Sequence, residues 1–231
     1  MILVCSDIHG DFQAYNKIIN KLTKRDKLYI IGDVIDRKAD GIKIIQDIMK
    51  RDNVELLLGN HEWFLLSCVL TNWSEGLVDG WTDSQNGGLI TMKNLLDLSE
   101  ESYNELIKFL RNCPIYKRIK VNDRYVNLVH GTYDSRLEHL ANKTFDNILF
   151  NKCKGYLSEG SILFDSLWDS PLKTLSTDGY KAGELYIHGH VPLRAGVPYK
   201  IEDFIIFIDG GTVYGGNQIL YNLTEDTYEL I

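Results

Sequence analysis

The chain has 231 residues, 44% of them hydrophobic and 25% charged, which is enough for one domain with a large core. No low-complexity run interrupts it, and this composition excludes a disordered chain. The formal net charge of -7 argues against non-specific binding to a nucleic-acid backbone or to an anionic membrane surface. We expect a single domain over residues 1–231.

The cysteines and the first residues of the sequence indicate the cellular compartment in which we expect the protein. The four cysteines, Cys5, Cys68, Cys113 and Cys153, are scattered and form no C-x-x-C pair, so neither a zinc knuckle nor a dithiol redox motif is indicated. The opening MILVCSD lacks the basic segment, the long apolar segment and the cleavage site of a signal peptide. No other stretch is long and apolar enough to span a membrane. We expect a reduced, cytoplasmic protein without a membrane partner.

The first part of the chain alternates short apolar runs with helical patterns. The apolar runs lie at residues 2–5, 28–31 and 54–58. Apolar residues at helical spacing follow each run, from Ala14 to Leu22, from Ile42 to Met49, and from Trp63 onward. Alternating strands and helices predict a parallel sheet with helices packed against it.

The middle of the chain has a different character. Residues 71–88 contain Trp73, Trp81 and the turn signal Asn86-Gly87-Gly88, which predict a structured loop over a site. Both tryptophans are more typical of packing than of substrate binding, because each can bury a large area. Residues 89–111 have a helical pattern, in which Ser102 and Glu105 have the spacing of a capping box.

The second half is richer in strands. The runs IYKRIKV and RYVNLVH flank a turn at Asn122-Asp123, and LYIHG, FIIFID and QILYNL follow them. We predict hairpin-like strands here. Together with the first half, they predict an α/β fold in which two sheets pack face to face as a sandwich flanked by helices.

Polar residues follow five of the predicted strands. VCSDIHG, IIGDVIDR, LLLGNHE, NLVHGTYD and YIHGHVP each place Asp, Asn or His where an apolar run ends. Because ligands bind at the carboxyl ends of strands in open α/β sheets, we expect these five ends to meet. The candidate site residues are Asp7, His9, Asp33, Asn60, His130 and His190.

These six side chains offer oxygen and imidazole nitrogen but no sulfur. The set suits Mn²⁺, Fe or Zn²⁺ and is poor for Ca²⁺, which prefers oxygen alone. Six ligands are too many for one metal that keeps an open position. They suit two metals about 3.5–4 Å apart that share a carboxylate, the arrangement used for in-line attack on phosphate esters.

Five ordered motifs resemble signatures of the phosphoprotein phosphatase (PPP) family of calcineurin-like metallophosphoesterases. They are DIHG at 7–10, GDVIDR at 32–37, GNHE at 59–62, HG at 130–131 and GHVP at 189–192. The resemblance extends to IDGGTVYGGN near the end of the sequence. It is strongest to small bacterial and phage members, such as bacteriophage lambda protein phosphatase and the symmetrical diadenosine tetraphosphate hydrolases. It implies a metallophosphoesterase-type sandwich.

The resemblance also implies how the candidate residues divide the work. Asp7 and His9 would bind the first metal, Asp33 would bridge, and the second metal would be held by Asn60, His130 and His190. The implied metals are two divalent ions, with Mn²⁺ expected and Fe or Zn²⁺ as alternatives.

Three further residues would complete the catalytic machinery that the resemblance implies. His61 would donate a proton to the leaving group, Asp36 would orient His61, and Arg37 would hold the phosphate. A hydroxide that bridges the metals would attack phosphorus. The independent chemistry agrees, because an Arg fork matches two phosphate oxygens and a carboxylate keeps a neighbouring imidazole protonated.

The resemblance predicts a phosphoric monoester hydrolase, specifically a serine/threonine protein phosphatase that acts on a phosphorylated protein or a small phosphoester. One alternative uses the same machinery on dinucleoside tetraphosphates or another nucleotide or RNA phosphoester. A second alternative is a non-catalytic binding protein of the same fold. The loops that would choose between substrates carry no decisive motif.

The sequence departs from the family pattern at two positions. Lys38 stands where the second motif ends in Gly, so the loop there is expected to differ or to bring a charge near the substrate. Ser170 follows Trp168 where a second phosphate-binding Arg is expected. The possible substitutes for that Arg are Arg136, Lys173 and Arg194.

Two histidines lie outside the motif positions. His139, within SRLEHLANK, is expected to be an exposed helical side chain. His188 lies two residues before His190 on the same predicted strand, and we expect it to support the site from behind or to be structural.

Overall fold

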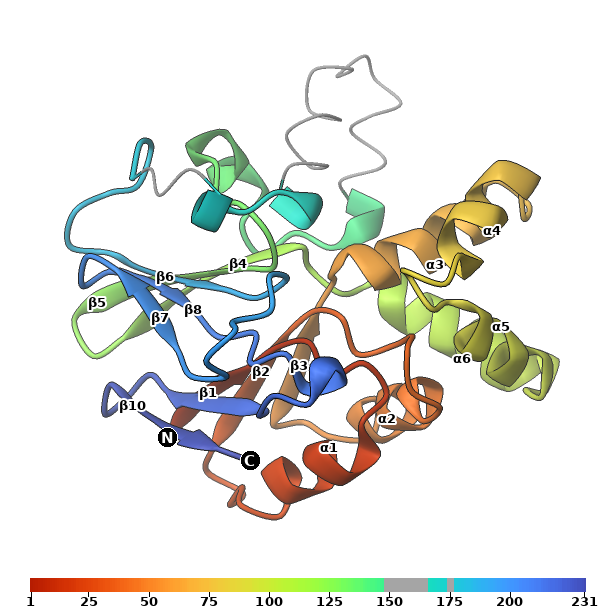
Figure 1. Ribbon diagram of the computed structural model, residues 1–231, viewed down its shortest axis with the longest axis horizontal. Coiled ribbons are helices and arrows are strands. Elements are labelled where there is room, and N and C mark those ends of the chain that lie inside the picture. The colour runs from red at the N-terminus through yellow and green to blue at the C-terminus, as the bar shows by residue number, and fades with distance from the viewer. Residues whose placement is uncertain (148–165, 174–176) are drawn as a thin grey trace.

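The computed structural model describes residues 1–147, 166–173 and 177–231. Two five-stranded sheets pack face to face and helices lie outside them (Figure 1), so the predicted α/β sandwich is confirmed. The first sheet has the order β10-β9-β1-β2-β3 and the second β4-β5-β6-β8-β7.

The strand bounds of the first sheet are β1 Ile2–Cys5, β2 Lys27–Ile31, β3 Val54–Leu57, β9 Ile219–Asn222 and β10 Thr227–Leu230. Those of the second sheet are β4 Tyr116–Val121, β5 Arg124–Val129, β6 Leu185–His188, β7 Tyr199–Ile201 and β8 Ile205–Phe207. The helices are α1 Phe12–Ile19, α2 Gly41–Ile48, α3 Asn60–Leu70, α4 Glu75–Thr82, α5 Leu89–Leu96 and α6 Glu100–Arg111, with 3₁₀ turns η1 Ser135–Leu140, η2 Pro171–Lys173 and η3 Thr212–Tyr214. Within the described ranges, no helix combines the length and the apolar character that a bilayer crossing requires.

Alternation along each strand builds the core. Val4, Ile31 and Leu57 of the first sheet point toward the second and form one apolar cluster with its strands. Their neighbours Cys5, Ile30 and Leu56 point the other way, into the larger cluster that includes the helices. Side chains on a strand alternate between its two faces, so a continuous apolar run is what a sheet buried on both faces requires.

The second sheet is less hairpin-like than predicted. Strands β4 and β5 form the expected hairpin around Asn122, whose φ of 53° suits a tight turn, and β7 pairs antiparallel with β8. Strands β5, β6 and β8 run parallel to one another, and β9 pairs with β1 of the first sheet. The parallel direction matters for the site, because parallel strands end at the same edge of a sheet.

The predicted loop at residues 71–88 contains α4, which the sequence did not reveal. Gly76 and Gly80 lie inside this helix and disfavour it locally. Tertiary packing compensates for this, because Trp81 at the end of α4 is completely buried. The predicted helix at 89–111 is divided into α5 and α6, and Ser99, not Ser102, caps α6 by accepting a hydrogen bond from the Ser102 amide.

Glu62, at the start of α3, fastens the loop after β3 to the loop after β2. Its Oε2 accepts hydrogen bonds from the amides of Gly59 at 2.9 Å and Asp33 at 2.8 Å. Its Oε1 accepts from the amides of Val34 at 2.8 Å and Ile35 at 3.2 Å. One buried carboxylate therefore holds the backbone on which two groups of polar side chains are mounted.

We predict that Glu62→Gln lowers the free energy of unfolding by about 2–3 kcal/mol, since hydrogen bonds to a charged group are strong and a buried group without a partner is costly. The Gln amide keeps one acceptor oxygen, but its NH₂ group faces two N–H donors. Chemical denaturation measures the change. A matched control is Glu55→Gln, because Glu55 is half-buried and pairs with Lys117 at 2.6 Å, a contact worth less than about 1 kcal/mol. Equal losses in both variants would contradict the role assigned to Glu62.

Candidate metal centre

The strand ends meet as expected. The six candidate ligands follow β1, β2, β3, β5 and β6, five of them in loops and Asn60 as the first residue of α3. Five of the six are buried: Asp7, His9, Asp33, Asn60 and His130. His190 is partly exposed. The site therefore forms where the carboxyl ends of parallel strands from both sheets come together.

Asp33 lies at the centre of this group. Its Oδ2 is 3.2 Å from His130 Nε2 and 3.7 Å from the Nε2 atoms of both His9 and His61. Two sets of side chains could each hold a cation, one formed by His9, Asp33 and His61 and the other by Asp33, His130 and His190. Asp33 belongs to both sets, which is the position that a bridging carboxylate would take.

The ring nitrogens of the histidines are oriented by main-chain carbonyl groups. The pairs are His9 Nδ1 with Ile35 at 3.0 Å, His130 Nδ1 with Ile31 at 2.9 Å, and His190 Nε2 with Trp168 at 3.0 Å. A nitrogen that donates to a carbonyl leaves the lone pair of the other ring nitrogen free to bind a metal. All three free nitrogens face the interior of the cluster.

Oxygen atoms fill the interior that these nitrogens face. Asn60 Oδ1 is 3.0 Å from both His130 Nε2 and His190 Nδ1. Asp7 Oδ1 is buried and has no hydrogen-bond partner in the described part of the chain, while Asp7 Oδ2 accepts from Ser6 Oγ and, at 3.0 Å, from the His190 amide. These oxygen atoms and the free imidazole nitrogens all carry lone pairs, so they can lie this close together only with a positive charge between them. The side chains at this site therefore suit bound cations.

Asp209 is a site residue that the sequence analysis missed. It follows β8, is 5% exposed, and accepts a hydrogen bond from the Gly211 amide at 2.9 Å. Burial and the nearby Asp33 raise the pKa of Asp209 to about 6, and burial together with Asp209 raises the pKa of Asp7 well above its usual range. The signal was present, because FIIFID places Asp209 where an apolar run ends, just as the recognised strands end in Asp, Asn or His.

His61 makes the contacts that a general acid would need. Its Nδ1 is 2.6 Å from Asp36 Oδ2, and its Nε2 points toward Asp33 and toward Arg37 Nη2 at 3.4 Å. Burial lowers the pKa of His61, but the carboxylates of Asp33 and Asp36 outweigh it and hold the pKa above its ordinary value. His61 Nε2 is also within reach of a cation held by His9 and Asp33, so the distances allow a ligand role as well.

Arg37 and Lys38 point to different partners. Arg37 Nη1 donates to the hydroxyl of Tyr214 at 2.7 Å, and Tyr214 is exposed on η3. Lys38 Nζ instead pairs with Asp11 at 2.6 Å, so its charge is already partnered. The left-handed backbone that a Gly at 38 would allow occurs earlier, at Asp36 with φ 70° and Arg37 with φ 67°.

Left-handed backbone is concentrated at the site. The non-glycine site residues with positive φ are Asp7, His9, Asp33, Asp36, Arg37 and His190. Each such residue costs about 1–3 kcal/mol unless its surroundings enforce the conformation. Gly59 shows how tightly the backbone packs there, because a Cβ at this position would lie 2.1 Å from Asp33 Oδ1.

The residues considered as substitutes for the second phosphate-binding Arg differ in their surroundings. Arg136 pairs with Asp134 at 2.5 Å, whereas Arg194 lines a hollow of about 430 Å³ together with Tyr214. The Lys173 side chain and Cys153 lie outside the described residues. Ser170 is buried and its Oγ accepts from the Leu172 amide at 3.3 Å. Among the described parts, Arg194 is therefore the candidate best placed to stand in for the second Arg.

The two other histidines agree with their predicted surroundings. His188 is buried, and its Nδ1 lies 2.5 Å from the Gly131 carbonyl while its ring stacks on Phe207. Its Nε2 lies 3.3 Å from Tyr180 Oη, so both ring nitrogens face away from the ligand cluster. His139 is an exposed side chain on η1.

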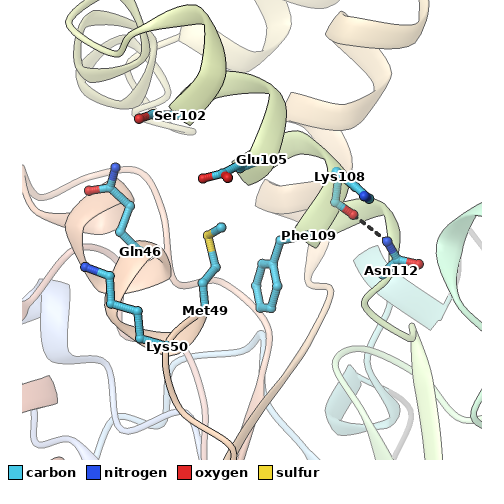
Figure 2. A pocket seen from close by; sticks show the side chains of 8 residues that line it. All are labelled: Gln46, Met49, Lys50, Ser102, Glu105, Lys108, Phe109 and Asn112. Atoms are coloured by element: carbon cyan, nitrogen blue, oxygen red, sulfur yellow. Dashed lines mark hydrogen bonds between the residues drawn. The ribbon is translucent and has the colours of Figure 1, made fainter.

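A second hollow, of about 620 Å³, opens between α2 and α6. Figure 2 shows Met49 and Phe109 facing one another in it, with Lys50 and Glu105 among the charged residues around them. None of the candidate site residues lines this hollow.

Curated relatives of the chain include symmetrical bis(5'-nucleosyl)-tetraphosphatases. The protein from Acidovorax sp. (strain JS42) is 26% identical over 136 residues, which cover 57% of this chain and 44% of that protein. The protein from Wigglesworthia glossinidia brevipalpis is 41% identical over 64 residues, or 26% of this chain and 24% of that protein. The chain thus spans less than half the length of either relative.

Solved structures share the fold and a model of one family covers nearly the whole chain. A protein serine/threonine phosphatase from Saccharomyces cerevisiae has a TM-score of 0.57 at 17% identity, covering 95% of this chain and 71% of that one. A cold-active protein-tyrosine phosphatase from a Shewanella species has a TM-score of 0.55 at 19% identity, covering 99% and 79%. At these identities the likeness shows the fold alone.

The model of the calcineurin-like phosphoesterase family matches residues 1–229, and the chain therefore belongs to that family.

Proposed function

We propose that this chain is a dinuclear-metal phosphoric monoester hydrolase. The observation that carries the proposal is the Asp33 carboxylate, whose Oδ2 faces His130 on one side and His9 and His61 on the other. The family is one of metal-dependent hydrolases, and the two sets of side chains that share Asp33 support two metals rather than one. Mn²⁺ is the proposed metal, because the site has oxygen and imidazole donors without sulfur.

The residues around the centre would divide the reaction as follows. Bound metals would supply an activated water and neutralise charge on the phosphoryl group. Arg37 would turn its guanidinium from Tyr214 to the phosphate oxygens, since the partner of Nη1 among the described residues is a neutral hydroxyl. His61, held by Asp36, would give its Nε2 proton to the departing oxygen.

Serine and threonine phosphates in proteins are the proposed substrates. The partly exposed position of His190 and the exposed Tyr214 place one side of the site at the surface, which suits a phosphate carried on a larger molecule. The names of the curated relatives favour a second candidate, a symmetrical dinucleoside tetraphosphate. A phosphorylated partner and the cytoplasmic location stay predictions.

The metal proposal predicts about two metals per chain and loss of phenyl phosphate hydrolysis on chelation, with recovery in Mn²⁺. Asp33→Asn should lose both metals or hold them without activity, because the residue faces both sets of ligands. His190→Ala should mainly weaken one site, and His139→Ala, on the surface, should weaken neither. Elemental analysis and calorimetric titration measure this. Two normal sites in Asp33→Asn would show that Asp33 does not bridge.

The acid role of His61 predicts a dependence on the leaving group. General acid catalysis contributes about 10²–10⁴-fold, so His61→Ala should slow hydrolysis of phenyl phosphate by about that factor. Dinitrophenolate leaves without a proton, and the same variant should lose far less on dinitrophenyl phosphate while keeping its metals. Equal losses on both substrates, with loss of metal, would make His61 a ligand.

The position of Arg194 provides a test of the two substrate classes. A phosphoserine peptide and diadenosine tetraphosphate are compared in the wild type and in Arg194→Gln. Arg25→Gln is the control, because Arg25 is exposed and precedes β2, whereas Asp33 and Arg37 follow that strand. A protein phosphatase should prefer the peptide. A tetraphosphatase should prefer the nucleotide. The additional phosphates of the nucleotide need additional cationic side chains, so Arg194→Gln should then raise KM for the nucleotide about tenfold more than it raises KM for the peptide. A preference for the nucleotide would replace the first candidate by the second.

A further inference from the structure

The carboxylate that orients His61 has a second donor. Asp36 Oδ2 accepts from Trp81 Nε1 at 2.7 Å, and the same oxygen lies 2.6 Å from His61 Nδ1. Both Asp36 and Trp81 are completely buried, and Asp36 Oδ1 has no hydrogen-bond partner among residues 1–147, 166–173 and 177–231. The sequence indicated packing for Trp81, but its indole N–H donates to the carboxylate that contacts His61.

The turn at residues 86–88 holds the indole ring in this place. The Gly88 amide donates to the Trp81 carbonyl at 3.1 Å, and a Cβ at Gly88 would lie 2.5 Å from Trp81 Nε1. The Gly87 carbonyl in turn accepts from the Arg37 amide at 3.3 Å. Only glycine allows the turn to approach the ring so closely, so the turn joins Trp81 to the loop that carries Asp36 and Arg37.

Asp36 needs this second anchor. Its backbone is left-handed, with φ 70°, so neither helix nor strand geometry fixes its side chain, and its amide donates to Thr91 Oγ1 at 3.0 Å. With only His61 as donor, the carboxylate could rotate about its own bonds. A second hydrogen bond on the same oxygen fixes both the position of the carboxylate and the direction of the imidazole.

We propose that Trp81 is a positioning residue for proton transfer from His61, an inference that rests on the proposed hydrolase function. The N–H of Trp81 holds the Asp36 carboxylate in the place where it orients His61 Nε2 toward the leaving oxygen. The neighbouring Trp73 does not share this role. Its ring lies 6.4 Å from that of Trp81, and no hydrogen bond joins it to Asp36 among the described residues.

The test compares Trp81→Phe with Trp73→Phe in the metal-loaded protein. The lost hydrogen bond is made to a carboxylate, so Trp81→Phe should slow hydrolysis of phenyl phosphate about ten- to a hundredfold, which corresponds to about 1.4–2.7 kcal/mol. Dinitrophenyl phosphate, whose leaving group needs no proton, should be slowed less than about threefold. Trp73→Phe should leave the ratio of the two rates as in the wild type, and metal content should be unchanged in both variants.

A second replacement protects the test from a folding defect. Site-specific incorporation of benzothienylalanine at position 81 keeps the size and shape of the indole and removes only the N–H. It should change the rate ratio as Trp81→Phe does. Equal slowing of both substrates, or no slowing by benzothienylalanine, would overturn the proposal while leaving the hydrolase function intact. A wild-type protein that hydrolyses neither ester would overturn both.

Discussion

The arrangement of this protein depends on one constraint, which is the crowding of acceptor atoms around the buried Asp33 carboxylate. Lone pairs from His9, His130 and Asn60 point at the same small volume as Asp33, and Asp7 adds an oxygen without a partner. Such a cluster is stable only with cations or protons among its members. Burial lowers the pKa of His130, but the nearby Asp33 carboxylate outweighs it and raises that pKa to about 10.

Much of the surrounding structure serves to hold those acceptors together. Glu62 accepts hydrogen bonds from four amides in the segments that follow β2 and β3. Main-chain carbonyls orient the rings of His9, His130 and His190, and Asp36 orients that of His61. The left-handed backbone at Asp7 and Asp33 turns the chain sharply just after β1 and β2 end. Burial of the two apolar clusters stabilises the fold and offsets the free-energy cost of this strained backbone, because each buried large apolar side chain contributes about 1.5–3 kcal/mol.

The features that could be predicted from the sequence are those that depend on residues close together in the chain. Apolar runs located the central strands, and the polar residues after them located the site, because strand ends are marked by a change of residue type within two or three positions. The edge strand β10 escaped notice because its residues are exposed and polar side chains interrupt it. Helix α4 also escaped notice, because its glycines oppose a helix that tertiary packing stabilises, including the burial of Trp81.

Roles that depend on distant contacts could not be predicted from the sequence. Asp209 closes a run like those that were recognised, but its proximity to Asp7 depends on β8 lying parallel to β6. The hydrogen bond from Trp81 to Asp36 joins residues 45 positions apart, and the contact of Arg37 with Tyr214 joins residues 177 apart. Neither spacing leaves a signal in the sequence, since only the packing of α4 and η3 around the loops creates them.

The measurement that tests this account most directly is an anomalous difference map from crystals grown with Mn²⁺. The account predicts two peaks at the carboxyl ends of the strands, about 3.5–4 Å apart, with a carboxylate oxygen of Asp33 in contact with both. One peak should lie near His9 and the other near His130 and His190. A single peak, or two peaks of which only one contacts Asp33, would contradict the bridging role on which the proposed chemistry depends.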